Sequence, residues 1–512
     1  MERHQQGVVS ASGFTPFAAL ERRVRRIASG LETLGVGPRT CVALLMRNDV
    51  AFLEVSYAVM RLGAYAVPIN WHFKGEEIAY ILADCGARAL FGHDDLLAAV
   101  AATLPPDLAV ISVASPRQLL AAYDVAPVTA AIPGTVAYDA WLDTLTTEHP
   151  GPVQPAPMSM IYTSGTTGAP KGVRRRAPSS EQATGLNALR ATIYGIRPGC
   201  RALVPGPLYH SAPNSYALNG GRIADLMVLM ERFDPERLLA IIDAEAIDTA
   251  FMVPTMFIRL LKLPEAVRRR YDVSCLRHII HAAAPCPADV KAAMLKWFGP
   301  VIYEFYGGTE TGPVSFATPE DALSKPGTVG RASPGALIRI LDEDGNLVPQ
   351  GAVGEVFSSY PVYPDFTYHN KDAKRVEVER DGFVTCGDIG YLDADGYLFI
   401  CDRRRDMVIS GGVNIYPAEI EAVLHSLEGV HDCAVFGIPD PDFGEALMAV
   451  VEPVAGAVLS PDAIRTHLSA HLADYKVPRT VEIRHGLPRE DSGKIFKRRL
   501  RDPYWEGSGR RI

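Results

Sequence analysis

A short run of glycine, serine and threonine residues followed by a lysine is the part of this sequence best suited to chemistry. It covers residues 163–172, Thr-Ser-Gly-Thr-Thr-Gly-Ala-Pro-Lys-Gly, directly after an apolar run at 158–162 that predicts a strand. Glycines let backbone N–H groups turn toward an anion, hydroxyls add donors, and Lys171 adds a positive charge. The run predicts a polyphosphate-binding loop, with a flexible surface loop as the plain alternative. It is not a Walker sequence, because Gly172 rather than Ser or Thr follows Lys171.

A second stretch with chemical potential, Tyr306-Gly-Gly-Thr-Glu310, lies well downstream. Tyr306 offers an aromatic face for a flat ring, and Gly307 and Gly308 clear space for a ligand. Thr309 can donate to a phosphate, and the Glu310 carboxylate is a hard oxygen ligand suited to Mg²⁺ that bridges phosphates. The plain alternative is a glycine-rich turn with a surface carboxylate. Two phosphate-site patterns in one chain favour a nucleotide-binding enzyme.

Four further features become informative beside these two stretches. His210 lies in a proline-rich loop, where a lone histidine is more often structural than functional. The small residues Ala282–Ala284 follow a predicted strand and allow a ring to approach closely, although tight helix–strand packing explains them nearly as well. Asp388 carries a carboxylate that can accept two hydrogen bonds. Lys494 lies in a basic run near the C-terminus, where a solvated tail is the ordinary interpretation.

Taken together, these segments resemble the signature motifs of the adenylate-forming superfamily, which contains acyl-CoA synthetases, luciferases and the adenylation domains of peptide synthetases. Five motifs stand in family order, and the resemblance covers residues from about 40 to 501. It implies an ATP-dependent, AMP-forming acyl-CoA synthetase, which is an acid–thiol ligase. Its partners would be a small carboxylic acid, ATP and CoA, with Mg²⁺ as a cofactor. Such an enzyme first forms an acyl adenylate and then transfers the acyl group to CoA.

The resemblance also implies roles residue by residue. Residues implied in catalysis are Lys494, Glu310, Thr163 and His210, with Glu310 as the metal ligand. Residues implied in binding the phosphates are Ser164, Gly165, Thr166, Thr167, Gly168, Lys171 and Thr309. Residues implied in binding adenine and ribose are Ala283, Ala284, Tyr306, Gly307, Asp388 and Arg403. Gly411 and Gly412 would line the CoA tunnel, and Arg405 would be the hinge of a mobile lid.

The acyl group is the least determined part of this prediction. The expected pocket residues are Tyr209, Asn214, Ala282 and Gly308, together with Gly307. Small side chains leave room for a long or broad group, so we favour a medium- or long-chain fatty acid. An aryl acid of the benzoate or cinnamate type is the alternative, and a luciferase-like oxidase or a carrier-protein adenylating enzyme stays open. Two positions depart from the family pattern, because Cys386 replaces a threonine and Arg405 replaces a lysine or aspartate.

The apolar spacing predicts the elements that must position these residues. Alternating helices and strands are predicted at 17–34, 42–46, 51–62 and 64–68. This alternation is typical of parallel sheets with helical crossovers. Residues 101–157 show weak periodicity and predict only a variable connection, and Arg174–Arg176 predict a solvated turn, with a basic lip for an anion as the weaker alternative. Residues 327–360 predict antiparallel strands of a smaller subdomain.

A charged stretch at 402–406 lies between two apolar segments and predicts a domain boundary. We expect an N-terminal domain at 1–402 that binds ATP and the acyl group, and a C-terminal lid domain at 403–512. The resemblance implies an α/β fold for the whole chain. The N-terminal domain would contain two αβ-sandwich subdomains and a small β-barrel subdomain, and the lid would be a small, mobile α+β domain.

Composition excludes several other classes of protein. The chain has 512 residues and a formal net charge of -8, so no overall positive field attracts nucleic acid. Its eight cysteines include no Cys-x-x-Cys pair, which argues against a zinc site or a disulfide framework and favours the cytoplasm. We see neither a signal peptide nor an apolar run of the ~18 residues that span a bilayer. The oligomeric state stays open, with a homodimer as one alternative.

Overall fold

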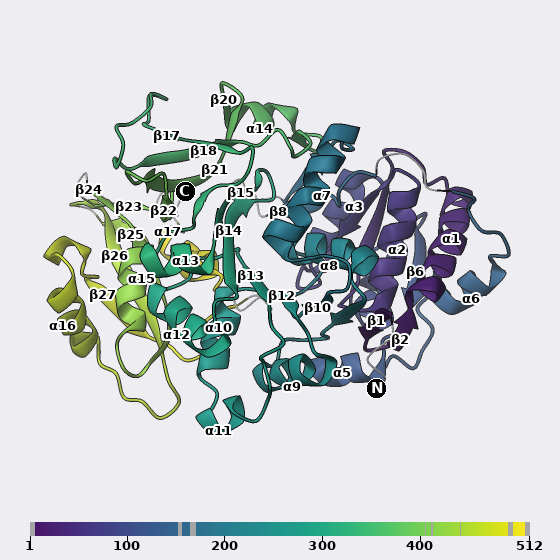
Figure 1. Cartoon of the computed structure of the whole chain (residues 1–512), viewed down its shortest axis with the longest axis horizontal. Helices are drawn as coiled ribbons and strands as arrows, with labels where there is room; N and C mark the ends of the chain where they lie inside the picture. The colour runs from purple at the N-terminus through teal and green to yellow at the C-terminus, as the bar shows by residue number, and fades with distance from the viewer. Residues whose placement is uncertain are drawn as a thin grey trace.

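The structure is a computed structural model of the chain. Strands and helices alternate along the part of the chain that lies at the right in Figure 1. The structure describes residues 6–151, 156–163, 170–404, 406–410, 413–440, 442–489 and 495–506. The predicted site residues outside these ranges are Ser164–Gly168, Arg405, Gly411, Gly412 and Lys494. Within the described ranges, no helix combines the length and the apolar character that a membrane crossing requires.

The first sheet is parallel, with strand order β4-β3-β5-β6-β7. Its strands are β3 (Cys41–Leu45), β4 (Tyr65–Pro68), β5 (Ala87–His93), β6 (Ala109–Val113) and β7 (Thr135–Ala137). The neighbouring helices are α1 (Phe17–Thr33), α2 (Val50–Arg61) and α3 (Gly75–Cys85). The predicted helices and strands at 17–68 are confirmed to within a few residues. All five residues of β3 are buried, as expected for a strand covered on both faces.

The prediction for residues 101–157 was wrong, because this segment completes the first sheet. It contributes the strands β6 and β7, the helix α5 (Arg117–Tyr123) and the helix α6 (Tyr138–Thr144). These elements are short, and α5, β7 and α6 include exposed positions among their apolar ones, which explains the weak periodicity. Packing against β5 rather than local sequence pattern therefore determines their structure.

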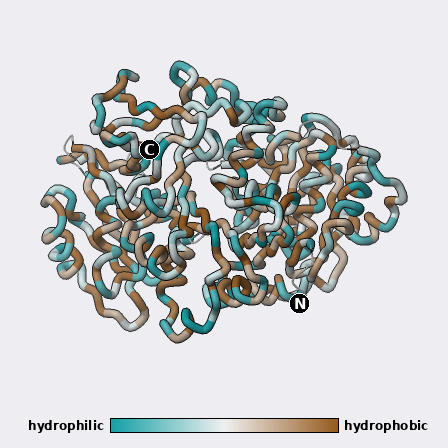
Figure 2. The backbone as a smooth tube through the Cα atoms, in the orientation of Figure 1, coloured by the Kyte–Doolittle hydropathy of each residue, from teal (hydrophilic) through white to brown (hydrophobic). Residues whose placement is uncertain are grey.

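A nine-stranded sheet forms the centre of the N-terminal domain, with order β16-β15-β14-β13-β12-β10-β11-β1-β2. Its strands are β1 (Gly7–Ser10), β2 (Gly13–Pro16), β10 (Arg201–Val204), β11 (Leu226–Leu229), β12 (Thr249–Met252), β13 (His278–His281), β14 (Ile302–Gly308), β15 (Gly312–Ala317) and β16 (Arg331–Ala332). The helices between these strands are α7 (Ser180–Tyr194), α8 (Ser211–Ile223), α9 (Pro235–Glu245), α10 (Pro254–Leu261), α11 (Glu265–Arg268), α12 (Ala288–Phe298) and α13 (Pro319–Ser324). The strands are the hydrophobic interior of this domain, and polar segments lie toward its outside (Figure 2).

A three-stranded sheet has the order β19-β9-β8, and its strand β8 contacts β4 of the first sheet. It consists of β8 (Ile161–Thr163), β9 (Lys171–Arg175) and β19 (Phe366–Tyr368). The predicted solvated turn at Arg174–Arg176 was wrong, because Arg174 and Arg175 belong to β9 and Arg175 is buried. Arg175 lies two residues after the buried Val173 and therefore on the same face of the strand.

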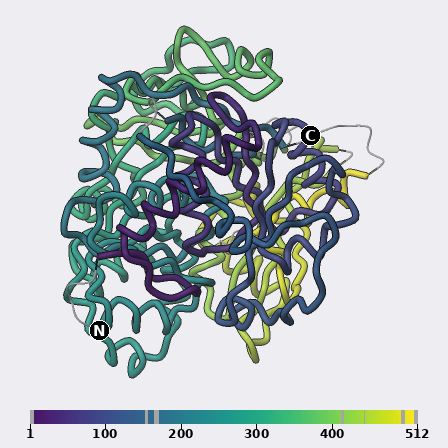
Figure 3. The backbone as a smooth tube through the Cα atoms, turned by 90° about the vertical axis from the view of Figure 1, so that its right-hand side faces the viewer, coloured from purple at the N-terminus to yellow at the C-terminus, as the bar shows by residue number. Residues whose placement is uncertain are grey.

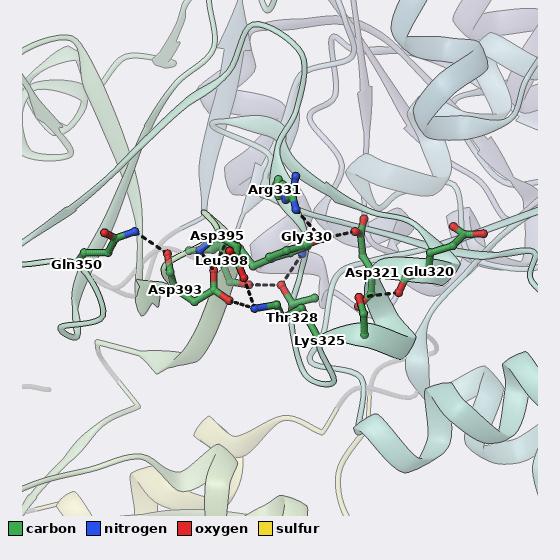
Figure 4. A network of polar contacts seen from close by, with 12 residues as sticks. Glu320, Asp321, Lys325, Thr328, Gly330, Arg331, Gln350, Asp393, Asp395 and Leu398 are labelled. Carbon is green, nitrogen blue, oxygen red and sulfur yellow. Dashed lines mark hydrogen bonds and ion pairs between the residues drawn. The ribbon is translucent and has the colours of Figure 1, made fainter.

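The antiparallel subdomain predicted around 327–360 is present. Its elements are β17 (Leu337–Leu341), β18 (Gly354–Ser359), α14 (Asp372–Glu377), β20 (Glu379–Arg380), β21 (Phe383–Leu392) and β22 (Leu398–Arg403). Lys325, which follows α13, donates to Asp393 at 2.8 Å and to Asp395 at 2.6 Å in the turn between β21 and β22 (Figure 4). Thr328 donates to the Leu398 carbonyl at 2.8 Å. These contacts fix the β21–β22 hairpin relative to the nine-stranded sheet.

The C-terminal part is an α+β domain with its own hydrophobic core. Its elements are β23 (Val408–Ser410), β24 (Val413–Ile415), α15 (Pro417–His425), β25 (Val430–Asp440), β26 (Gly444–Pro453), α16 (Pro461–His471), β27 (Thr480–Ile483) and α17 (Lys497–Trp505). It lies beside α10 and α12, at the left in Figure 1, and Figure 3 shows it from the side. The Lys262 ammonium, directly after α10, contacts the His431 Nδ1 at 2.8 Å. The boundary at 402/403 remains a prediction, and β22 ends at Arg403.

Candidate active site

The first wall of the candidate site is the β8–β9 hairpin, whose loop was predicted to hold phosphates. Thr163 pairs with Lys171 across the hairpin, so these two residues face each other at the base of that loop. The Lys171 ammonium lies 5.3 Å from the centre of the Tyr368 ring. Burial lowers the pKa of Lys171, and the nearby charge of Lys374 acts in the same direction. Burial and a neighbouring positive charge both disfavour the charged form of Lys171, so an anionic ligand would stabilise that form.

The second wall is the turn between β14 and β15, which carries Glu310. The Tyr368 hydroxyl donates to the Glu310 carboxylate at 3.1 Å. Tyr368 belongs to β19, which pairs with β9, so the strand that carries Lys171 also positions Glu310 through its neighbour. A carboxylate is a hard oxygen ligand that fits Mg²⁺, so Glu310 could hold the ion that the sequence analysis expects.

The third wall is the β21–β22 hairpin, which carries Asp388 and Arg403 as a directly paired couple. Asp388 is buried, and it accepts a hydrogen bond from the Tyr306 hydroxyl at 2.7 Å. The Arg403 Nε lies 3.4 Å from the other carboxylate oxygen of Asp388. Burial raises the pKa of Tyr306, and the Asp388 charge adds to this shift. The structure thus brings together three residues that the sequence analysis assigned to the nucleoside.

Gly307 and Gly308 are required by the local chain geometry. A Cβ atom on Gly307 would lie 1.8 Å from the Gly312 carbonyl oxygen across the hairpin. A Cβ atom on Gly308 would lie 2.5 Å from the Cys386 sulfur. The Cys386 Sγ also contacts the Thr311 hydroxyl at 3.7 Å, so this cysteine fills the space between the β14–β15 turn and β21. These glycines therefore carry no information about the size of the acyl group.

The predicted adenine-binding segment begins directly after β13. Ala282 is buried, whereas Ala283 is exposed and adopts a φ of 75°, an uncommon conformation for a residue with a side chain. Beneath this segment, the Lys291 ammonium forms a buried ion pair with Glu304. His281 pairs with Glu304 in the register of β13 and β14, and its Nδ1 lies 3.9 Å from that carboxylate. A buried charged group thus supports the strand ends from which Ala282–Ala284 and Tyr306 emerge.

Tyr209, His210 and Asn214 lie where β10 leads into α8. The ring of Tyr209 is buried, 4.5 Å from the centre of Trp71 and 4.3 Å from that of His210. His210 is the residue before the first turn of α8. The buried Asn214 amide donates to the Leu208 carbonyl at 3.0 Å and closes this loop. Their predicted contacts with the acyl group remain predictions.

Two residues of the site were missed by the sequence analysis. Tyr368 holds the Glu310 carboxylate, and no pattern around residue 368 marks it. Arg175 donates to the carbonyls of Thr309 and Glu310, at 3.0 Å and 2.6 Å. Here the signal was present, because the two-residue period of β9 places Arg175 on the face of the apolar Val173.

A separate group of metal-ligand types, His425, Asp432 and Cys433, lies in the C-terminal domain with ligand atoms within 4.8 Å of one another. Asp432 already forms an ion pair with Arg489, and its other oxygen accepts the Cys433 N–H at 2.8 Å. The Cys433 thiol lies 3.7 Å from the Glu421 carbonyl, which it can contact as a donor. These contacts explain the cluster as part of the domain's polar framework.

Comparison with known families gives two matches along the chain. The family model described as "AMP-binding enzyme" matches residues 8–362, and the one described as "AMP-binding enzyme C-terminal domain" matches residues 419–494. The N-terminal match contains the β8–β9 hairpin and the β14–β15 turn. The C-terminal match ends at Lys494.

Individual relatives cover almost the whole chain. A feruloyl-CoA synthase from an Amycolatopsis species is 35% identical over 98% of this chain and 96% of its own. An indoleacetate–CoA ligase from Aromatoleum aromaticum is 33% identical over 94% and 91%. A long-chain-fatty-acid–CoA ligase from Mycobacterium tuberculosis is 31% identical over 95% and 93%. The crystal structure of ATP-bound MatB from Rhodopseudomonas palustris is 27% identical with a TM-score of 0.81, covering 99% of this chain and 97% of MatB.

Proposed function

Because the chain belongs to the family of AMP-binding enzymes and is an AMP-forming CoA ligase of the adenylate-forming superfamily, we propose that it activates an aryl acid as an acyl adenylate and transfers the acyl group to CoA. One observation supports the nucleotide site most directly. Lys171, Glu310 and Asp388 come from three distant hairpins, and Tyr368 and Tyr306 connect them to one another.

The first half-reaction follows from this arrangement. A carboxylate oxygen of the acid attacks the α-phosphorus of ATP, the bond to the pyrophosphate oxygen breaks, and acyl-AMP and pyrophosphate form. Asp388 and Arg403 hold the ribose, while Thr163 and Lys171 hold the leaving phosphates. Mg²⁺ at Glu310 would neutralise the charge on the phosphates. The protein contributes chiefly orientation and charge stabilisation.

The second half-reaction needs a different surface. The CoA thiol attacks the acyl carbon, the acyl–phosphate bond breaks, and AMP leaves. We assign Lys494 to the first half-reaction, as a point charge between the carboxylate and the α-phosphate. Rotation of the C-terminal domain about Arg405 would then exchange Lys494 for Gly411 and Gly412, which would line the CoA path. The domain division at 402/403 is part of this proposal.

The choice of acid rests on two findings. Gly307 and Gly308 are small because the chain and Cys386 leave no space there, so they give no support to a long acyl chain. The relatives at 35% and 33% identity are named for feruloyl and indoleacetate groups, both of which are aromatic. A medium- or long-chain fatty acid is the second candidate, favoured by the relative at 31% identity.

Two measurements test this function. A panel of benzoates, cinnamates and fatty acids assayed for pyrophosphate release should show the highest kcat/KM with an aryl acid, whereas preference for a C8–C16 fatty acid would favour the second candidate. Lys494→Ala should lose adenylation while it keeps most thioester formation from preformed acyl-AMP. Equal loss of both half-reactions would show that the role given to Lys494 is wrong.

A further inference from the structure

Arg175 is buried at the junction of three segments that lie far apart in the sequence. Its own strand is β9, and its guanidinium donates to the carbonyls of Thr309 at 3.0 Å and Glu310 at 2.6 Å in the β14–β15 turn. It also donates to the Pro364 carbonyl, just before β19. The rings of Tyr363 and Phe366 lie 5.4 Å and 5.6 Å from the guanidinium carbon.

All of these hydrogen-bond acceptors are backbone carbonyls. In the part of the chain that the structure describes, no carboxylate oxygen lies within ion-pair distance of Arg175. Burial lowers the pKa of Arg175, but a guanidinium stays protonated in proteins. Burial of an ion without a paired counter-charge costs several kcal/mol, which an apolar residue on this face of β9 would avoid. This cost suggests a role beyond packing.

The contacts indicate what that role is. Lys171 lies on the same strand four residues earlier, and the main chain of Glu310 is attached to the Arg175 side chain. Tyr368 holds the carboxylate end of Glu310 from the neighbouring strand β19. Both ends of Glu310 are therefore attached to the sheet that carries Lys171. Among the described residues, the side chains of Arg175 and Tyr368 are the ones through which β9 and β19 form hydrogen bonds with the β14–β15 turn.

We propose that Arg175 is a positioning residue for MgATP: it fixes the Thr309–Glu310 main chain against β9 and thereby sets the Glu310 carboxylate relative to Lys171. This inference rests on the proposed nucleotide site. Glu310 is assigned to the metal and Lys171 to the phosphates, so loss of Arg175 should weaken the binding of both. Binding of the nucleoside should persist, because Asp388 and Arg403 lie on another hairpin and do not contact Arg175.

The test compares Arg175→Gln with Arg176→Gln, because Arg176 is the neighbouring arginine and its side chain is exposed. Isothermal titration calorimetry would measure the dissociation constants of MgATP and of adenosine, and the Mg²⁺ concentration that half-saturates ATP binding. In Arg175→Gln we expect the MgATP constant and the half-saturating Mg²⁺ concentration to rise about tenfold, the change that ~1.4 kcal/mol produces. The adenosine constant should stay within about twofold, as should every value for Arg176→Gln.

Three results would overturn the inference. The first is that Arg175→Gln binds MgATP as tightly as the wild type. The second is that Arg175→Gln loses affinity for MgATP and for adenosine equally, and the third is that Arg176→Gln shows the same selective loss of MgATP affinity. If Arg175→Gln does not fold, as judged by circular dichroism, Arg175→Lys takes its place, because it keeps the charge and can reach fewer carbonyls. A selective loss of MgATP affinity in Arg175→Lys supports the role, and unchanged affinity contradicts it. Wild-type protein that binds no MgATP would instead refute the proposed nucleotide site itself.

Discussion

Asp388 allows the sharpest test of how the nucleoside is held. Its carboxylate accepts from the Tyr306 hydroxyl at 2.7 Å and lies 3.4 Å from the Arg403 Nε, which leaves acceptor positions for two ribose hydroxyls. A hydrogen bond to a charged group contributes ~1.5–3 kcal/mol. We take the lower value, because the Arg403 side chain beside it is 41% exposed. Two bonds then contribute about 3 kcal/mol, or about 150-fold in affinity.

The assay removes the hydroxyls from the ligand as well as the carboxylate from the protein. Isothermal titration calorimetry would compare ATP with 2′,3′-dideoxy-ATP on wild type and on Asp388→Ala. Wild type should prefer ATP by about 150-fold, and Asp388→Ala should bind both ligands equally. The preference is a ratio within each variant, so a general weakening of the site cancels. Glu343→Ala, at an exposed carboxylate in the connection between β17 and β18, should keep the wild-type preference.

Either of two results would refute this reasoning. Asp388→Ala could retain the full preference for ATP, which would place the ribose elsewhere. Alternatively, the wild type could fail to distinguish the two ligands, which would mean that its carboxylate does not contact the hydroxyls.

Two further predictions concern the framework beneath the site. Burial lowers the pKa of His278 to about 4, from 6.5 in the unfolded chain, so its contribution to stability is complete above pH 6.5 and is lost as the pH falls toward 4. Urea denaturation at several pH values would measure the free energy of unfolding. In the wild type and in the exposed-site control His471→Gln, we expect His278 to lower it by about 3 kcal/mol as the pH falls over this range, and in His278→Gln we expect this contribution to be absent. Lys291→Met leaves the Glu304 carboxylate buried without its partner, so the free energy of unfolding should fall by about 3–5 kcal/mol. A second change, Glu304→Gln, should recover part of it, and a loss below about 1 kcal/mol in the single variant would contradict a buried ion pair.

Local sequence pattern predicted the elements whose residues repeat with a clear period. The helix α1 has buried residues at Leu20, Val24, Ile27 and Leu31, and this spacing alone locates it. The strands β6 and β7 lack such a pattern, and they form because β5 offers an unpaired edge. The sequence of residues 101–157 alone does not indicate that β5 is available for pairing.

The candidate site shows the same division between local and long-range information. Glu310 and Asp388 were found because their neighbours in sequence form recognisable motifs. Tyr368 was not found, because its role depends on β19 lying against β9, a pairing between segments almost 200 residues apart. Arg175 was misassigned because a run of three arginines is typical of a solvated turn, whereas burial of alternate residues in β9 puts only one of them inside.

The most direct measurement of the proposed function is the exchange of labelled pyrophosphate into ATP by the purified chain. With Mg²⁺ and an aryl or fatty acid present, we expect label to enter ATP, and with the acid omitted we expect none. Subsequent addition of CoA should convert the acyl adenylate to acyl-CoA and AMP. Exchange that does not depend on any carboxylic acid, or no exchange with every acid of the panel, would contradict carboxylate activation at this site.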